Sequence, residues 1–302
     1  EPGEVHGGEV PIFCDAPGAV ALDRPPSLPV QEERAQGVAG SFILRNVLSQ
    51  EECSDIVALG EAMGFSADTP TLRDDVRERF HGRFGQLRAP RCVWLASEAL
   101  NAALFARLRP FLPPSSLGGA LRGLNRRWRI YRYTPGQQFL PHLDDGYEAS
   151  YLDAAGRVAT DPDRRSLLTV LVYLTGGLRG GQTRFWVPDK DLEDFSHYSI
   201  HPVTGNALLF FHGAHPLSPI HEGCGVAAGA KHVLRGDVLY DRGAGEDRQR
   251  AEFQARARRW PHVYAGRLKW ERLGRGGAGV DWEGGGRFDV VQFLEAVLGA
   301  SV

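Results

Sequence analysis

The chain has 302 residues, which is enough for one large catalytic domain or two small ones. Its 42% hydrophobic and 24% charged residues are typical of a globular protein. The formal net charge of -2 disfavours nucleic-acid binding through bulk positive charge. No apolar run approaches the roughly 18 residues that a membrane-spanning helix needs, so no membrane segment is predicted.

The four cysteines are isolated in the sequence and form no Cys-x-x-Cys pair. This spacing disfavours a cysteine-ligated zinc site and predicts free, buried thiols in a reducing compartment. Residues 1–40 lack a basic start followed by an apolar core, so no signal peptide is predicted and a cytoplasmic location is favoured.

Residues 1–40, rich in Pro, Gly and acidic residues, are predicted to form an extended N-terminal arm. A first strand is expected over Ser41–Leu48. Ser49 and Glu52 have the spacing of a capping box, which predicts a helix running to about Met63 and ending at Gly64.

The segment 68–91 is polar and rich in arginine. It is interpreted either as a solvated loop or as a mobile lid that favours an acidic substrate. A strand is then expected over Cys92–Ala96, followed by a helix that Ser97 caps and that runs through Leu108.

The middle of the chain is dominated by β signals, with strands predicted over 128–133, 166–174, 180–186, 206–211 and 231–240. Many short strands separated by Gly and Pro turns favour a sandwich or barrel. We therefore expect an α+β, mainly β domain over residues 41–245, with helices packed on one side. The polar segment Asp145–Arg165 is interpreted as a substrate-gating loop. Residues 246–302 are expected to form a C-terminal extension that wraps the core and ends in a helix.

His142 and Asp144 are separated by one residue, so in a strand their side chains point to the same face. Two imidazoles and one carboxylate are the ligand set of non-haem Fe(II) oxygenases. His-x-Asp alone is a common pattern, and a third ligand must come from a distant segment. The candidates His212, His215 and His221 cannot be separated by spacing.

Five motifs occur in order: His142-x-Asp144, Gly180-Gly-Gln-Thr-Arg-Phe185, Gly205-Asn-Ala-Leu-Leu-Phe-Phe211, His221-Glu-Gly223 and Gly229-Ala-Lys231. Together with the segment 42–53, they resemble the Fe(II)- and 2-oxoglutarate-dependent dioxygenases, specifically the prolyl 4-hydroxylase-like branch. The resemblance covers about residues 41–242. It implies a double-stranded β-helix, a jelly-roll core with supporting helices.

The resemblance implies that His142, Asp144 and His221 are the iron ligands. It also implies that Lys231, ten residues after His221, pairs with the distal carboxylate of 2-oxoglutarate. Arg235 is the rival anchor, because positions 231 and 235 share one face of a strand.

Further pocket residues follow from the same resemblance and from strand alternation. Tyr133 and Tyr173 match tyrosines that hydrogen-bond the cosubstrate, with core packing as the alternative, and Thr169 shares the face of Tyr173. Arg129 and Tyr131 alternate with Tyr133, and a buried arginine needs an anionic partner from substrate, cosubstrate or scaffold. Asp145, which directly follows the ligand pair, is a further candidate for substrate contact.

The implied activity is hydroxylation of a C–H bond with Fe(II), 2-oxoglutarate and O2, and with ascorbate as reductant, hence L-ascorbic acid binding. Succinate and CO2 are the coproducts. A prolyl residue of a peptide or protein is the first substrate expected, and a free amino acid or small metabolite is the alternative. A jelly-roll metal-binding protein without oxygenase activity would leave Lys231 unexplained. The expected partner is the substrate alone, without membrane or nucleic acid, and a monomer is favoured.

Overall fold

The computed structural model describes residues 12–14, 20–66, 89–142, 144, 146–188, 195–213, 215 and 217–243. No helix within these ranges is long and apolar enough to cross a membrane. All four cysteines are free, and Cys53, Cys92 and Cys224 are buried. The predicted lid lies almost wholly outside the described residues, as do Asp145 and the extension 246–302.

Helix α1 spans Gln50–Met63 and begins with the predicted capping box. The hydroxyl of Ser49 accepts from the backbone N–H of Glu52, and the Glu52 carboxylate accepts from the backbone N–H of Ser49. Two of the amides that a helix start leaves unpaired are satisfied in this way. The prediction of this helix is confirmed.

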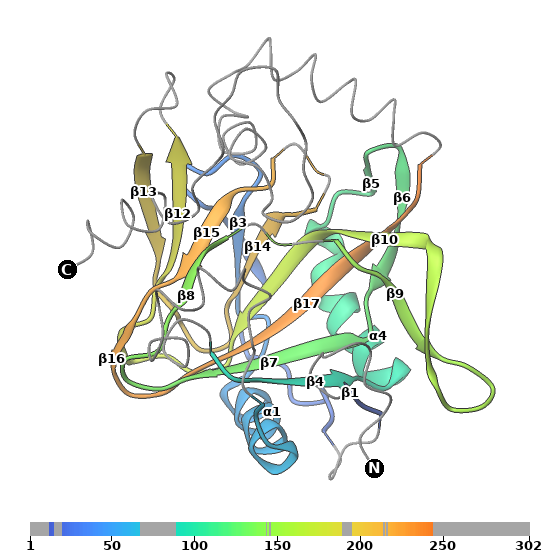
Figure 1. Ribbon diagram of the computed structural model, residues 1–302, viewed down its shortest axis with the longest axis horizontal. Helices are drawn as coiled ribbons and strands as arrows, with labels where there is room; N and C mark the ends of the chain where they lie inside the picture. The colour runs from blue at the N-terminus through green and yellow to red at the C-terminus, as the bar shows by residue number, and fades with distance from the viewer. Residues whose placement is uncertain are drawn as a thin grey trace, which may run out of the picture.

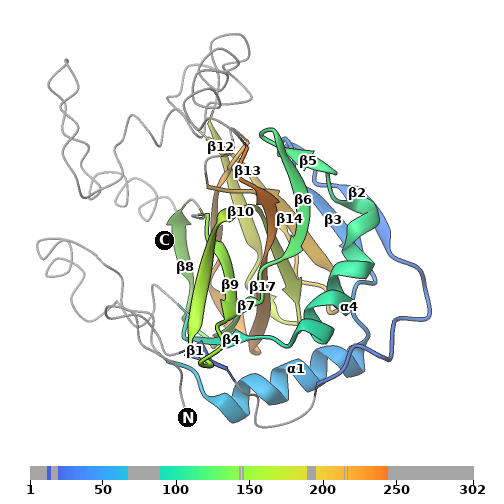
Figure 2. The ribbon, with the colours of Figure 1, turned by 90° about the vertical axis from the view of Figure 1, so that its right-hand side faces the viewer.

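Helix α4 spans Glu98–Leu108, with Ser97 as its cap as predicted, and leads into the 3-10 helix η1, Arg109–Phe111. The two helices are joined by an ion pair in which Arg107 donates to both oxygens of Glu52, at 2.7 and 2.8 Å. Figure 2 shows α4 on the side away from β8 and α1 running along the bottom, beneath β1 and β4.

The large sheet has eleven strands. Its main path runs through β1 (Ile12–Phe13), β4 (Arg91–Leu95), β7 (Arg127–Tyr133), β17 (Lys231–Asp241), β10 (Val158–Tyr173), β14 (Ala207–Phe211), β3 (Phe42–Arg45) and β2 (Gln31–Arg34). The remaining strands are β5 (Ser115–Ser116), β6 (Gly119–Leu124) and β9 (Glu148–Leu152).

A second sheet of four strands has the order β13 (Phe195–Ile200), β12 (Thr183–Pro188), β15 (Ile220–Gly223) and β8 (Phe139–His142). The short strands β11 (Arg179–Gly180) and β16 (Val226–Ala228) pair separately. Figure 1 shows the four-stranded sheet beside the long strands β17 and β10 of the large sheet. The fold is the expected jelly-roll core, mainly β, with its helices on one side.

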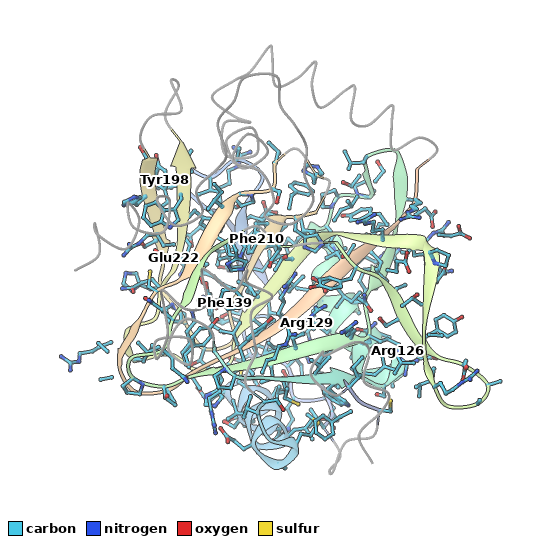
Figure 3. The ribbon with its side chains drawn as sticks, viewed as in Figure 1. Arg126, Arg129, Phe139, Tyr198, Phe210 and Glu222 are labelled. Atoms are coloured by element: carbon cyan, nitrogen blue, oxygen red, sulfur yellow. The ribbon has the colours of Figure 1, made fainter. Side chains whose placement is uncertain are left out.

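Strand alternation divides the large sheet into two faces. Ile130 and Leu234 belong to the core cluster that contains the buried side chains of α1 and α4. Tyr131 and Val233, one position along, belong to the cluster that also holds residues of β12 and β14. Side chains including Phe139 and Phe210 fill the space between the sheets (Figure 3). The second face therefore forms the interior where a site can lie.

The structure differs from the sequence-based prediction at residues 145–165 and adds detail to it in the N-terminal arm. Much of the expected gating loop 145–165 is a β-hairpin, in which β9 pairs with the start of β10. Its residues are polar because most of β10 up to Arg165 is not buried. The N-terminal arm contributes β1 and β2, which extend the large sheet at both ends of its main path.

Candidate active site

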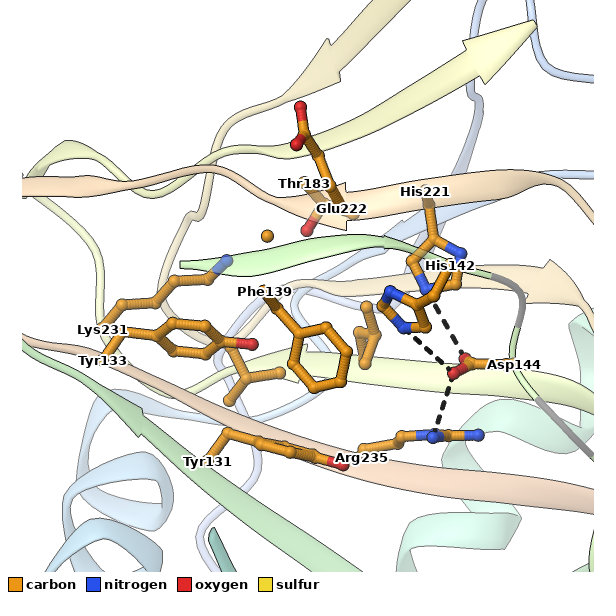
Figure 4. Close-up of a pocket in the computed structure, with 13 residues that line it drawn as sticks. Tyr131, Tyr133, Phe139, His142, Asp144, Thr183, His221, Glu222, Lys231 and Arg235 are labelled. Atoms are coloured by element: carbon orange, nitrogen blue, oxygen red, sulfur yellow. Dashed lines mark ion pairs between the residues drawn. The ribbon is translucent and has the colours of Figure 1, made fainter. Parts of the chain in front are cut away.

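Strands β8 and β15 bring the two predicted histidine ligands together. His142 and His221 are direct partners in the antiparallel register, and their ring centroids lie 4.3 Å apart. Asp144 follows β8 by two residues. Ligand atoms of the three side chains lie within 4.8 Å of one another, with Nε2 of His142 3.5 Å and Nε2 of His221 3.7 Å from the Asp144 carboxylate (Figure 4).

The chemical state of this cluster fits a divalent metal. Burial lowers the pKa of His221 to about 3, so its imidazole is neutral. Its Nδ1 lies 3.2 Å from the carbonyl oxygen of Pro219, which can only accept. Nδ1 therefore carries the proton, and the lone pair of Nε2 faces the cluster. Although burial opposes ionisation of Asp144, Arg235 and the two histidines hold the pKa of Asp144 well below its usual range.

Lys231 lies at the other end of the same interior face. It opposes Tyr133 in the register of β17 and β7, is only 2% exposed, and places Nζ 5.0 Å from the Tyr133 ring and 5.8 Å from the Tyr173 ring. Burial lowers the pKa of its ammonium group to about 8. Within the described part of the chain, no carboxylate pairs with it. Such a buried cation is suited to an anionic ligand.

One cavity connects Lys231 with the His-Asp-His cluster. Figure 4 shows Lys231 at one end and the cluster at the other, with Tyr133 and Phe139 between them. The lining residues are Tyr131, Tyr133, Phe139, His142, Asp144, Leu171, Thr183, His221, Glu222, Gly223, Lys231, Val233 and Arg235. The wall is largely aromatic and aliphatic, with charged groups confined to a few positions.

The comparisons with known proteins agree with this arrangement. The sequence model of the 2OG-Fe(II) oxygenase superfamily matches residues 128–236, which contain all three cluster residues and Lys231. Residues 128–236 thus carry the sequence pattern of the 2OG-Fe(II) oxygenase superfamily. The cofactors that this match implies are Fe(II), 2-oxoglutarate and O2. No curated protein matches the chain.

Solved structures similar to this chain include several prolyl hydroxylases. The viral collagen prolyl hydroxylase of Paramecium bursaria Chlorella virus-1, in complex with 2-oxoglutarate, is 19% identical over 69% of this chain and 98% of its own, with a TM-score of 0.42. A Pseudomonas putida prolyl-4-hydroxylase is 19% identical, covering 68% of this chain and 94% of its own, with a TM-score of 0.37. A Trichoplax adhaerens prolyl hydroxylase bound to a hypoxia inducible factor peptide is 17% identical, covering 70% and 86%, with a TM-score of 0.43.

Of the three candidate histidines, only His221 joins His142 and Asp144 in one cluster. His212 is fully buried behind the cluster, where it contacts Thr169 and Ser166. His215 stacks on Phe211, with ring centroids 3.6 Å apart. Three-dimensional position thus separates residues that spacing could not.

Arg235 lines the cavity, but its guanidinium group is already paired. Nη1 lies 3.0 Å from Asp144 and Nη2 lies 3.3 Å from Asp237. These carboxylates hold the pKa of Arg235 well above its usual range against the opposing effect of burial. Arg235 thus differs from Lys231, which has no carboxylate partner within the described residues.

The remaining predicted residues lie around the cavity in different ways. Tyr131 and Tyr133 line it, whereas Tyr173 lies behind the lining and donates to Thr183 at 2.9 Å. Thr169 also lies behind the lining, with its hydroxyl 2.8 Å from Asp144. Arg129 is buried, and its anionic partner is the scaffold residue Asp237, at 2.7 Å.

Phe139, Thr183, Glu222 and Asp237 were not among the predicted site residues. Asp237 could have been found from the sequence, because Lys231, Arg235 and Asp237 fall on one face of a largely apolar strand. Charged residues that share the interior face of a buried strand indicate a functional or ion-paired interior. Phe139 and Thr183 carried no comparable signal, since an isolated aromatic residue or hydroxyl is ordinary in a strand.

Proposed function

We propose that this dioxygenase holds Fe(II) through His142, Asp144 and His221 and anchors 2-oxoglutarate on Lys231, in order to hydroxylate a prolyl residue of a peptide or protein. One observation carries the binding assignment. A buried ammonium group, with no carboxylate partner among the described residues, and a His-Asp-His cluster occupy opposite ends of one cavity. A dicarboxylate with a 2-oxo group carries a distal carboxylate for the ammonium group and a 2-oxo acid group for the metal.

The geometry favours Lys231 over Arg235 as the anchor. A carboxylate that bound Arg235 would have to compete with Asp144 and Asp237, which already accept from its two terminal nitrogens. Lys231 offers its donors without such competition. The hydroxyl groups of Tyr133 and Thr183, which line the cavity, are available as further donors to the cosubstrate.

The metal, when bound, supplies the activation of O2 that lets one oxygen atom enter a C–H bond and the other enter succinate as CO2 is released. The protein side chains have separate tasks. Two imidazoles and a carboxylate leave coordination positions for other ligands, Lys231 fixes the cosubstrate, and the aromatic wall excludes water.

The substrate end of the proposal rests on the wall of the cavity and on the motif resemblance to the prolyl 4-hydroxylase-like branch. Tyr131 and Phe139 pack edge to face at 6.1 Å and, with Leu171 and Val233, form an apolar surface suited to an aliphatic ring. A free amino acid is the second candidate. The cavity residue Glu222, whose carboxylate lies 3.2 Å from Arg184, offers an acceptor for the ammonium group of such a substrate.

A substrate panel tests the prolyl assignment. Succinate formation is measured with Fe(II), 2-oxoglutarate and ascorbate in the presence of proline-containing peptides, the same peptides with alanine for proline, and free amino acids. We expect stimulation by the proline peptides alone, and a mass increase of one oxygen atom on proline. Stimulation by a free amino acid and by none of the peptides would favour the second candidate.

A further inference from the structure

Behind the His-Asp-His cluster, a chain of buried hydrogen bonds ends on Asp144. The hydroxyl of Thr169 lies 2.8 Å from Oδ2 of Asp144 and 2.6 Å from Nδ1 of His212. Nε2 of His212 lies 2.8 Å from the hydroxyl of Ser166, which accepts from the backbone N–H of Tyr147. Thr169, His212 and Ser166 are fully buried, so water does not compete for these contacts.

The donor and acceptor of each hydrogen bond in this series are fixed by the Asp144 carboxylate, at which the series ends. An ionised carboxylate only accepts, so the single proton of the Thr169 hydroxyl goes to Asp144. Thr169 must then accept from His212, which places a proton on Nδ1 of the imidazole. Burial lowers the pKa of His212 to about 4, so its Nε2 is unprotonated and accepts from Ser166. Each donor therefore points toward Asp144.

The register of the large sheet holds the chain in place. Thr169 on β10 lies between Asp237 of β17 and Phe210 of β14, its direct partners in the two neighbouring strands. His212 follows β14, and its backbone N–H donates to the carbonyl oxygen of Leu167. The position of the Thr169 hydroxyl is thus set by three adjacent strands rather than by a loop.

We propose that Thr169 and His212 are positioning residues that orient the carboxylate of Asp144 for the metal, with His212 acting through Thr169. This inference rests on the proposed function. Outer hydrogen bonds to a ligating carboxylate typically contribute 10- to 100-fold to metal affinity. Arg235 holds the other oxygen of Asp144 at 3.0 Å, but it is a cation and competes with the metal for the carboxylate. The neutral Thr169 hydroxyl orients the Asp144 carboxylate without competing with the metal for it.

The first test reads the tautomer of His212 by long-range 1H–15N NMR on the metal-free full chain at neutral pH. The His212 signals are assigned by their absence in His212→Gln. We expect a proton on Nδ1 and none on Nε2. The opposite tautomer would overturn the inference, because Thr169 would then donate to His212 and leave Asp144 without that bond.

The second test measures Mn(II) affinity from the EPR signal of the free ion, without 2-oxoglutarate. Thr169→Val removes the hydroxyl at constant shape, and we expect about 10-fold or greater loss of affinity. Thr169→Ser keeps the hydroxyl and should stay within about twofold of the unmodified chain. Thr175→Val is the matched control, because the Thr175 hydroxyl contacts the backbone of Ala230 and His232 rather than Asp144. Its Mn(II) affinity should not change.

The outcomes separate this inference from the proposed function. If Thr169→Val binds Mn(II) as tightly as the unmodified chain, the positioning role is wrong while the metal site stands. If the unmodified chain binds no Mn(II), the metal assignment itself is wrong. Thermal unfolding of each metal-free variant shows whether the fold is retained, and a Thr169→Val chain that does not fold moves the decision to the tautomer and to Thr169→Ser.

Discussion

At the scale of single residues, the site depends on one contrast between two cations on the same strand. Arg235 is paired with Asp144 and Asp237, whereas Lys231 is buried against the rings of Tyr133 and Tyr173. A buried charge is costly when it lacks a partner. In the proposed binding mode the distal carboxylate of the cosubstrate supplies that partner, so Lys231 should contribute strongly to affinity for 2-oxoglutarate.

Substitution of Lys231 by alanine should weaken 2-oxoglutarate binding by at least about 30-fold, since loss of one member of a buried charge pair costs about 2–5 kcal/mol. Lys231→Arg retains the positive charge and should lose less. Arg132→Ala is the control, because Arg132 pairs with Glu61 outside the cavity. Titration calorimetry with Mn(II)-loaded protein measures all three. Equal affinity for the alanine variant and the unmodified chain would exclude Lys231 as the anchor.

The pH dependence of cosubstrate affinity follows from the same residue. Burial lowers the pKa of Lys231 to about 8, so the free protein carries the charged form below that pH and loses it above. A dianionic ligand requires the charged form. Affinity for 2-oxoglutarate should therefore fall as the pH rises from 8 to 9.5, by up to about tenfold per pH unit.

An arginine stays charged throughout this pH range, so Lys231→Arg should show a nearly flat profile. Affinities measured at four or five pH values in both proteins would decide the matter. A profile of the same slope in Lys231→Arg would assign the titration to another group.

At the scale of secondary-structure elements, the helices support the sheet without entering the site. The carboxylate of Glu52 is fully buried, and it joins the start of α1 to Arg107 of α4. Its removal leaves a largely buried guanidinium group without its carboxylate partner. It also leaves two backbone amides, those of Ser49 and Arg24, without an acceptor. This contact is structural and lies on the far side of the large sheet from the cavity.

Glu52→Ala should lower the free energy of unfolding by about 3–5 kcal/mol, the cost of breaking a buried ion pair. Ser49→Ala removes only the cap and should cost about 1 kcal/mol. Urea unfolding measures both. Mn(II) affinity of the folded protein should remain unchanged in Ser49→Ala, and a large loss would contradict the separation of the helices from the site.

The elements that sequence could predict are those with local signals. The capping box at Ser49 and the Ser97 cap gave both helices, and the β-branched run of β10 gave its core strand. The hairpin of β9 and β10 was not predicted, because its side chains are polar and the paired strands are largely exposed. Apolar alternation marks a strand only where one face is buried, so an exposed hairpin resembles a loop.

In the candidate site, too, residues close in sequence could be predicted to act together, whereas partners from distant strands could not. His142 and Asp144 could be paired from their spacing, but the choice of His221 required a resemblance because its partner strand is β8, far earlier in the chain. The hydrogen-bond chain from Ser166 through His212 to Thr169 could not be predicted. It joins residues that only the pairing of β10 with β14 brings together.

At the scale of the whole molecule, the site joins two sheets that local sequence does not connect. Of the proposed metal ligands, His142 and His221 lie on β8 and β15 of the small sheet, whereas Lys231 and Arg235 lie on β17 of the large sheet. A ligand that bridges the two should stabilise the folded state against separation of the sheets. Metal and cosubstrate are therefore expected to act as stabilisers as well as reactants.

Chelation of metal should lower the midpoint of thermal unfolding, and addition of Mn(II) should restore it. At a free ligand concentration 100 times the dissociation constant, a ligand that binds only the folded state contributes about 2.7 kcal/mol. His142→Ala should abolish the response to Mn(II). A variant that still responds as strongly as the unmodified chain would place the metal elsewhere.

The most direct test of the account is anaerobic absorption spectroscopy of the protein with Fe(II) and 2-oxoglutarate, because a metal-to-ligand charge-transfer band requires both to share one site. We expect the band in the unmodified chain and in the control variant Ser49→Ala. His221→Ala should lose it, and Lys231→Ala should need a far higher concentration of 2-oxoglutarate to show it. A band of full strength in both His221→Ala and Lys231→Ala, at the same 2-oxoglutarate concentration as the unmodified chain, would contradict the assignment of this cavity.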